Sequence, residues 1–280
     1  MALTLRSLTA KPVVLLAALL LVAIVCAGLL APCRYDAQDR DAISAGVSRG
    51  HLLGTDDLGR DRFSRLLFGL RTSLLAASAA AALTIILGAA IGTAASLAPP
   101  LLTGAVLGMS DLVLSLPWFF LLVILRAALP LSAPPAESMV LTFVALGLIG
   151  WPIPARLVCD FLVSQRRSKA VCYAVACGMD EPRAFRSVAL GGVFSILLAQ
   201  FLVFVPAYVV AEANLGILGL GITEPMPSMG GMLRSLVASS SRSFLDWMPI
   251  YVMVFLLSAG QLGSMWSKRW NAIACRSFSS

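Results

Sequence analysis

The charged residues of this chain are confined to the gaps between long uncharged stretches. The longest uncharged stretch runs from Thr72 to Ser110, and a helix needs about 20 apolar residues to cross the hydrocarbon core of a bilayer. Only 12% of the residues are charged and 59% are hydrophobic, whereas a soluble domain is about a quarter charged. Because a helix satisfies its own backbone in lipid, the pattern predicts an all-α polytopic membrane protein.

Six transmembrane helices are expected. The stretch from Thr72 to Ser110 is too long for one helix, and Pro99-Pro100 divides it because proline lacks the amide donor and restricts the preceding residue. The first stretch could also be a signal peptide, since it has a basic start and an apolar core, but its length favours a retained span. The expected spans cover residues 12–33, 72 to the Pro99 turn, 103–125, 138–155, 187–211 and 247–267.

Basic residues predict the orientation of these spans. Alternation places segment 164–186 on the same side as both chain ends, and all three are basic. The positive-inside rule then predicts N- and C-termini in the cytoplasm, in a multi-pass protein of the cytoplasmic (inner) membrane. Segment 34–71 would lie outside, where its seven arginines are offset by aspartates.

The expected organisation has three parts. Residues 1–71 form an N-terminal transmembrane helix with an extracytoplasmic loop, residues 72–267 a permease domain and residues 268–280 a cytoplasmic tail.

The sequence shows no enzyme chemistry. It contains no phosphate-binding P-loop and no HExxH motif, and its one histidine is His51. Its six cysteines form no CxxC pair, so we expect no catalytic residue, no metal site and no cofactor. The net charge of +7 is spread between the spans rather than gathered on a basic face with interleaved aromatics, and no nucleic-acid partner is expected.

A glycine-punctuated segment follows the first span. Its aspartates lie close to Arg60, Arg62 and Arg65 in the sequence, so we expect local ion pairs to order a loop that docks at the membrane surface. A metal site is the alternative, but the ligand spacing does not support it. The candidate residues here are Gly54, Thr55, Asp56, Gly59, Arg60 and Asp61.

A second segment lies between the fourth and fifth spans. An Ala-rich helix to Cys177 is expected to end at Gly178, which tolerates the left-handed cap position. A new short helix would begin after Asp180, with Glu181 and Pro182 in its first turn. Two short helices at a cytoplasmic surface suggest a binding site for another protein, and an amphipathic interfacial hairpin is the alternative. The side chains expected to project from it are Arg183, Phe185 and Arg186.

Two acids lie nearest the hydrocarbon. Asp111 falls inside the third expected span and Glu212 at the end of the fifth. Ionisable groups in a membrane are functional candidates, although either acid could cap a helix or pair with an arginine. Glycines four residues apart, at Gly88/Gly92 and Gly104/Gly108, predict close helix packing.

Three motifs together resemble one family, the permease subunits of binding-protein-dependent ABC importers in the dipeptide, oligopeptide and nickel branch. Segment 54–61 resembles the branch's external signature, residues 155–158 with Gly178 its cytoplasmic coupling motif, and residues 212–221 the segment after its fifth span. The resemblance covers about residues 49–267.

The resemblance implies a type I importer permease fold with no catalysis of its own. Its implied partners are a second permease subunit, two cytoplasmic ABC ATPase subunits and an extracytoplasmic solute-binding protein, within a lipid bilayer. The substrate would be peptides or a related small solute such as nickel. Two alternatives remain: an ion-coupled secondary transporter or channel that uses Asp111 and Glu212, and a non-transporting membrane assembly subunit.

Overall fold

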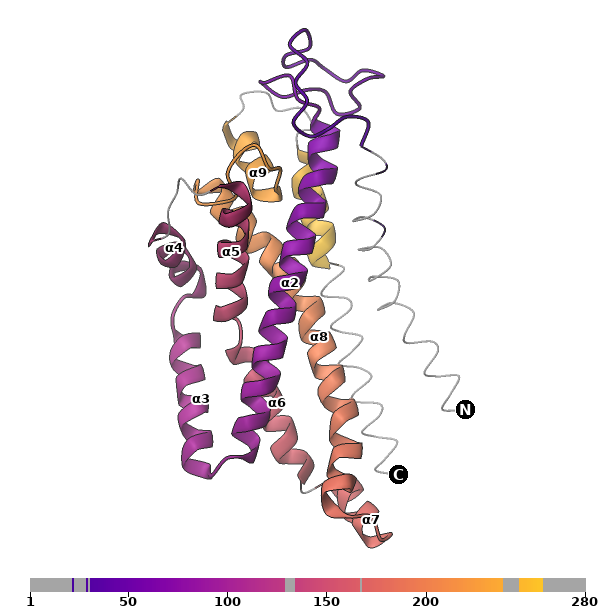
Figure 1. The fold of residues 1–280 in the computed structure, drawn as a ribbon, viewed down its shortest axis with the longest axis vertical. Coiled ribbons are helices and arrows are strands. Elements are labelled where there is room, and N and C mark those ends of the chain that lie inside the picture. The colour runs from indigo at the N-terminus through magenta and orange to yellow at the C-terminus, as the bar shows by residue number, and fades with distance from the viewer. Residues whose placement is uncertain are drawn as a thin grey trace.

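The computed structural model describes residues 22, 29, 31–128, 134–166, 168–238 and 247–258. The labelled elements within these residues are all helices, as expected, and they lie side by side in an elongated bundle (Figure 1). They are α2 (Arg62–Leu97), α3 (Pro100–Ser115), α4 (Trp118–Ala128), α5 (Pro135–Ile149), α6 (Pro152–Arg166), α7 (Lys169–Ala176), α8 (Glu181–Ile217) and α9 (Met229–Ala238). A further apolar helix covers Met248–Ser258.

Helix α2 is the centre of the bundle, and it packs against α5, α6 and α8. It begins where the carboxylate of Asp61 accepts a hydrogen bond from the Ser64 amide at 2.7 Å, which satisfies one of the free amides of the first turn. It ends at Leu97, and α3 starts at Pro100. The turn predicted at Pro99-Pro100 is therefore confirmed.

Glycines allow α2 to approach α6 closely. A methyl group added to Gly88 would lie 2.4 Å from a side-chain carbon of Pro154, and one added to Gly92 would lie 2.3 Å from the carbonyl oxygen of Ala155. The first predicted packing motif is thus confirmed. The second is wrong within the described part of the chain, because no atom lies within 4 Å of a methyl group added at Gly104 or Gly108.

A polar contact ties three helices together inside the bundle. The Thr84 hydroxyl of α2 donates to the Gly147 carbonyl of α5 at 3.0 Å and lies 2.6 Å from the Tyr208 hydroxyl of α8. These groups are buried in an otherwise apolar interior, so the contact satisfies polar atoms that lipid and apolar side chains cannot satisfy.

The described residues contain three helices that are long and apolar enough to cross a membrane: α2, Pro135–Arg166 and α8. A fourth follows if α3 and α4 count as one broken span, and their axes bend by 78° at the break. The prediction of one continuous helix over 103–125 is therefore wrong, because Pro117 interrupts it. The count of six stays a prediction, since span 12–33 lies almost wholly outside the described residues and span 247–267 is described only to residue 258.

The fifth span is much longer than expected. Helix α8 begins directly at Glu181 and continues through the proline at position 206 to Ile217. The expectation of a separate short helix after Asp180 is therefore wrong, because the chain between Arg186 and the apolar span contains no residue that ends the helix.

The bundle has two distinct ends (Figure 1). The loop of residues 31–61 lies at one end together with α9. Helix α7 and the turn between α2 and α3 lie at the other. With 36 and 37 residues, α2 and α8 are each about 55 Å long, which exceeds the hydrocarbon thickness of about 30 Å.

Candidate functional site

The elbow between α7 and α8 forms one end of the molecule. The Ser168 hydroxyl caps α7 by accepting from the Val171 amide, and the helix ends where Gly178 adopts φ +90°. The Gly178 amide donates to the Val175 carbonyl at 2.9 Å, which closes the last turn. Asp180 then occupies the N-cap position of α8, as predicted, although its side chain makes no capping hydrogen bond.

The elbow presents both charged and apolar side chains. Arg183 and Arg186 are exposed, as expected, and the Tyr173 side chain is 69% exposed. Phe185 instead packs inward against α6, with the Arg166 guanidinium 5.8 Å from its ring centroid. The expectation that Phe185 projects outward is wrong, because it shares a helical face with the buried Ala189.

Two glycines shape the loop at the opposite end. Gly54 and Gly59 have φ values of +72° and +73°, a region that favours glycine. A methyl group at Gly59 would lie 2.0 Å from the Asp39 carbonyl oxygen. The buried Thr55 hydroxyl accepts from the Ala45 amide at 2.8 Å, so the signature segment is folded onto the loop before it.

A cluster of charges links this loop to a distant part of the chain. Arg60 donates to Asp56 at 2.8 Å and also to Glu224. Arg65, whose side chain is nearly buried, donates to Glu224 at 2.8 Å. Burial alone would raise the pKa of Glu224, but the hydrogen bonds and charges of Arg65 and Arg60 outweigh it and lower that pKa. The carboxylate is therefore held ionised and anchors segment 218–228 to the start of α2.

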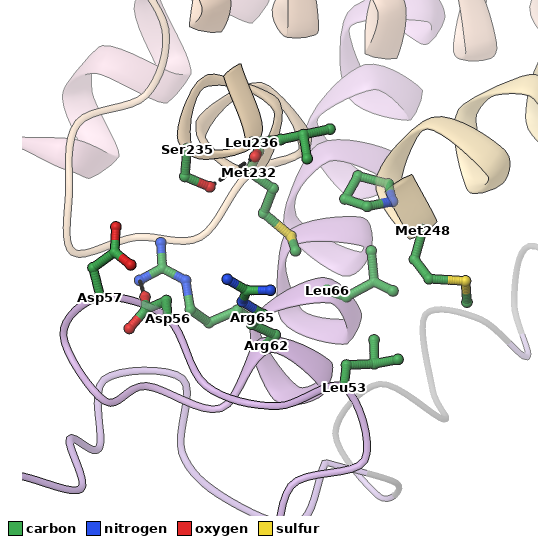
Figure 2. Close-up of a pocket in the computed structure, with 11 residues that line it drawn as sticks. Leu53, Asp56, Asp57, Arg62, Arg65, Leu66, Met232, Ser235, Leu236 and Met248 are labelled. Carbon is green, nitrogen blue, oxygen red and sulfur yellow. Dashed lines mark hydrogen bonds and ion pairs between the residues drawn. The ribbon is translucent and has the colours of Figure 1, made fainter. Parts of the chain in front are cut away.

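Figure 2 shows Asp56 and Arg65 lining a small cavity between the loop of residues 31–61, the start of α2 and α9. Residues Leu66 and Met232 form part of its apolar wall. Local ion pairing was expected here, and it is confirmed for Asp56, whose carboxylate lies within 4 Å of both Arg60 and Arg65.

Asp61 has a different role from the one expected. Besides capping α2, its carboxylate lies 3.1 Å from the Nδ1 atom of His51. It is 3% exposed, so its place in the loop is structural. Groups of three or more potential metal ligands are absent from the described residues.

Glu212 lies fully buried near the C-terminal end of α8 and joins three segments. Its Oε2 atom accepts from the Ser73 hydroxyl of α2 and from the Gly230 amide of α9, both at 3.2 Å. The Ser73 hydroxyl in turn accepts from the Met229 amide at 3.1 Å. The Oε1 atom has no hydrogen-bond partner among the described residues. The carboxyl group is thus a junction between α2, α8 and α9.

Asp111 pairs with an arginine, one of the roles left open for it. The Arg156 guanidinium of α6 donates to both carboxylate oxygens of Asp111, at 3.3 Å in the longer of the two contacts. The pair is partly exposed and joins α3 to α6.

Arg126 is a buried cation that sequence reasoning did not single out. It is 2% exposed, and its guanidinium donates to the Ser138 hydroxyl at 2.6 Å. That hydroxyl donates to the Gly221 carbonyl at 3.3 Å. The arginine therefore links α4 and α5 to the segment that follows α8.

Comparison with known proteins settles the family. Residues 84–272, more than half of the chain, match the family model described as "Binding-protein-dependent transport system inner membrane component". The chain belongs to this family. The predicted resemblance to ABC importer permeases is therefore confirmed, and the protein is a multi-pass inner membrane component of a transport system.

Curated relatives extend the match. The chain is 27% identical to the oligopeptide transport system permease protein OppC of Haemophilus influenzae over 90% of this chain and 79% of the relative. It is 30% identical to the dipeptide permease DppC of Alkalihalophilus pseudofirmus over 74% of this chain and 65% of the relative. The glutathione permease GsiD of Pectobacterium atrosepticum is 31% identical over 71% of this chain and 65% of the relative.

Sequence reasoning located the segments but missed their partners. It found the signature loop, the elbow and both acids, because each has a local pattern of glycine, charge or apolar neighbours. It missed Glu224, Ser73 and Arg126, since none of these has a distinctive neighbourhood. The contact between Arg65 and Glu224 joins residues 159 positions apart, and no spacing rule connects them.

Proposed function

We propose that this chain is one of two permease subunits of an ATP-driven importer and forms half of a translocation path for peptides. Its membership of the family supports a permease role, and the printed names of the relatives support a peptide substrate. The second permease, two ATPases below the elbow and an extracytoplasmic binding protein complete the proposed assembly.

The observation that carries the mechanism is the continuity of α8. One helix runs from the exposed elbow at Glu181 to the Glu212 junction and ends at Ile217. A continuous helix that packs against its neighbours at both ends transmits a displacement from one end to the other. A push at the elbow would therefore reach the outer end of the bundle, where Glu212 holds α9 and Ser73 of α2.

The proposal includes an orientation of the bundle in the membrane. The elbow with Gly178, Asp180, Glu181, Arg183 and Arg186 faces the cytoplasm, together with both termini. The loop of residues 31–61 and α9 face outward, where a binding protein would deliver substrate. The positive charge of segment 164–186 supports this direction.

Charge reversal at the elbow tests the proposal. In the double variant Arg183→Glu/Arg186→Glu, we expect recovery of the ATPase subunits with the permease to fall by about tenfold, the equivalent of about 1.4 kcal/mol. If the ATPases remain bound, we expect ATP hydrolysis without uptake. Recovery is measured by co-purification in detergent and coupling by uptake per ATP hydrolysed in liposomes.

Arg234→Glu is the matched control. This arginine is exposed at the opposite end of the bundle, so its reversal should leave the recovery of the ATPases unchanged. Equal recovery and equal coupling in the elbow variant and the wild type would refute the proposed contact. Uptake by the permease alone, without nucleotide, would refute the importer proposal as a whole.

A further inference from the structure

An ion pair is partly exposed at membrane depth. The Asp111 side chain is 58% exposed and that of Arg156 is 38% exposed. Asp111 lies in the first part of the broken span, and Arg156 lies on the α6 part of the helix pair Pro135–Arg166, one residue beyond the expected span 138–155. Charged side chains within spans face the bundle interior or water rather than lipid. The face formed by α3 and α6 is therefore unsuited to hydrocarbon.

The helix break beside this pair leads to the same conclusion independently. The axis turns at Leu116 and Pro117, and the side chains of Leu116 and Trp118 are 52% and 48% exposed. Irregular backbone at membrane depth is tolerated only where it is buried in protein or lines a water-filled cavity. The break therefore also requires protein or water in front of it.

A cavity of about 290 Å³ opens at this break. It lies between α3, α4, the junction of α5 and α6, and α8, and its wall includes Val113, Trp118, Ile153 and Tyr208. Neither charged residue lines the cavity itself, but Asp111 lies one turn before the lining residue Leu114 on α3, and Arg156 lies one turn after the lining residue Ile153 on α6. The ion pair thus borders the cavity on the side nearer the elbow.

We propose that Asp111 and Arg156 line the water-filled translocation path of this subunit. This inference rests on the proposed function. Water is favoured over a dry contact with the second permease, because burying a charged pair costs more than its attraction returns unless every remaining polar atom finds a partner. The two charges together attract zwitterionic segments of a peptide without binding either end tightly.

Cysteine labelling in the assembled complex tests the inference. Ser115 lies one turn beyond Asp111 on α3 and is exposed, so Ser115→Cys in a cysteine-free background leaves the ion pair intact. Ile86→Cys on α2 is the matched control, because Ile86 is 65% exposed and lies about as many residues from the Pro99 turn as Ser115 does. A membrane-impermeant methanethiosulfonate should modify Cys at 115 at least about tenfold faster, since the reactive thiolate does not form in hydrocarbon.

The two charges allow a second measurement, whose result would not change if the pair had a purely structural role. With Ser115→Cys, the ratio of the rates for an anionic and a cationic methanethiosulfonate is measured. Asp111→Asn should raise this ratio by about threefold and Arg156→Gln should lower it by a similar factor, as expected for one charge a few ångströms away in water.

The outcomes separate the two proposals. Slow modification at position 115, equal to that at position 86, in a complex that still couples ATP hydrolysis to uptake would overturn the inference and leave the proposed function standing. A rate ratio that neither charge affects would also overturn it. Loss of coupling between ATP hydrolysis and uptake in the cysteine-free complex, before any labelling, would count against the proposed function. The inference is then judged by the ratio of the anionic and cationic modification rates alone.

Discussion

Single residues with special backbone or bonding requirements hold together the end of the molecule opposite the elbow. Gly59 combines a positive φ with a Cβ position occupied by the Asp39 carbonyl. The buried Glu212 carboxylate accepts hydrogen bonds from two donors of other segments instead of from water. Both residues act through geometry that a substitution can test directly.

Gly59→Ala should destabilise the loop of residues 31–61. A non-glycine residue at positive φ costs roughly 1–2 kcal/mol, and the clash at 2.0 Å adds to it. Since local opening controls proteolysis, we expect trypsin to cut at the exposed Arg40 at least about tenfold faster in the purified protein. Gly46→Ala is the control, because no atom lies within 4 Å of an added methyl group there. Equal cleavage rates would show that the loop does not depend on Gly59.

Glu212→Gln should preserve the junction, whereas Glu212→Ala should break it. Glutamine keeps an oxygen that can accept from the Ser73 hydroxyl and the Gly230 amide, but alanine leaves two buried donors unpaired at about 1–3 kcal/mol each. We expect the melting temperature in detergent to fall by several degrees for alanine only. Loss of uptake in a stable glutamine variant would instead favour the ion-coupled alternative.

At the scale of helices, the bundle depends on close contact between α2 and α6. Local signals correctly predicted the turn at Pro99-Pro100, the end of α7 at Gly178 and the N-cap at Asp180, because proline and glycine act on their own backbone. They could not predict which glycine motif packs, since that depends on the helix opposite. The motif at Gly88 and Gly92 meets α6, and the motif on α3 meets no atom within 4 Å.

Gly92→Ala should destabilise the bundle more than Gly108→Ala. The added methyl group would lie 2.3 Å from the Ala155 carbonyl oxygen, and overpacking of this kind costs about 1–3 kcal/mol. At Gly108 the substitution meets open space and favours the helix slightly. Thermal unfolding of both variants in detergent measures the difference. A Gly92→Ala protein as stable as the wild type would mean that the two helices do not cross at this glycine.

At the scale of the whole molecule, α8 joins two chemically different ends. The elbow offers exposed arginines and a tyrosine, and the opposite end is closed by the Glu224 cluster and the Glu212 junction. Because one helix connects them, the orientation of α8 in the membrane decides which of these ends lies on the cytoplasmic side.

Labelling of native cysteines tests that orientation. Cys33 lies in the loop of residues 31–61 and is partly exposed, and Cys177 is exposed at the elbow. In variants that each retain one of these cysteines, a thiol reagent that cannot cross the membrane should label Cys33 in intact cells. Cys177 should react only after the membrane is opened. The opposite pattern would reverse the proposed topology.

The sequence by itself determined the membrane class, the family, the turn between α2 and α3 and the position of the elbow. The membrane class follows from apolar length, the family from the resemblance of three motifs, and the turn and the elbow from the local chemistry of proline and glycine, which act over a few residues. Only the tertiary structure decided that Glu224 binds Arg65, that Asp111 pairs with Arg156 across 45 positions, and that the third span is bent. Partners so far apart meet only when helices pack, and no local pattern records which faces those helices turn to one another.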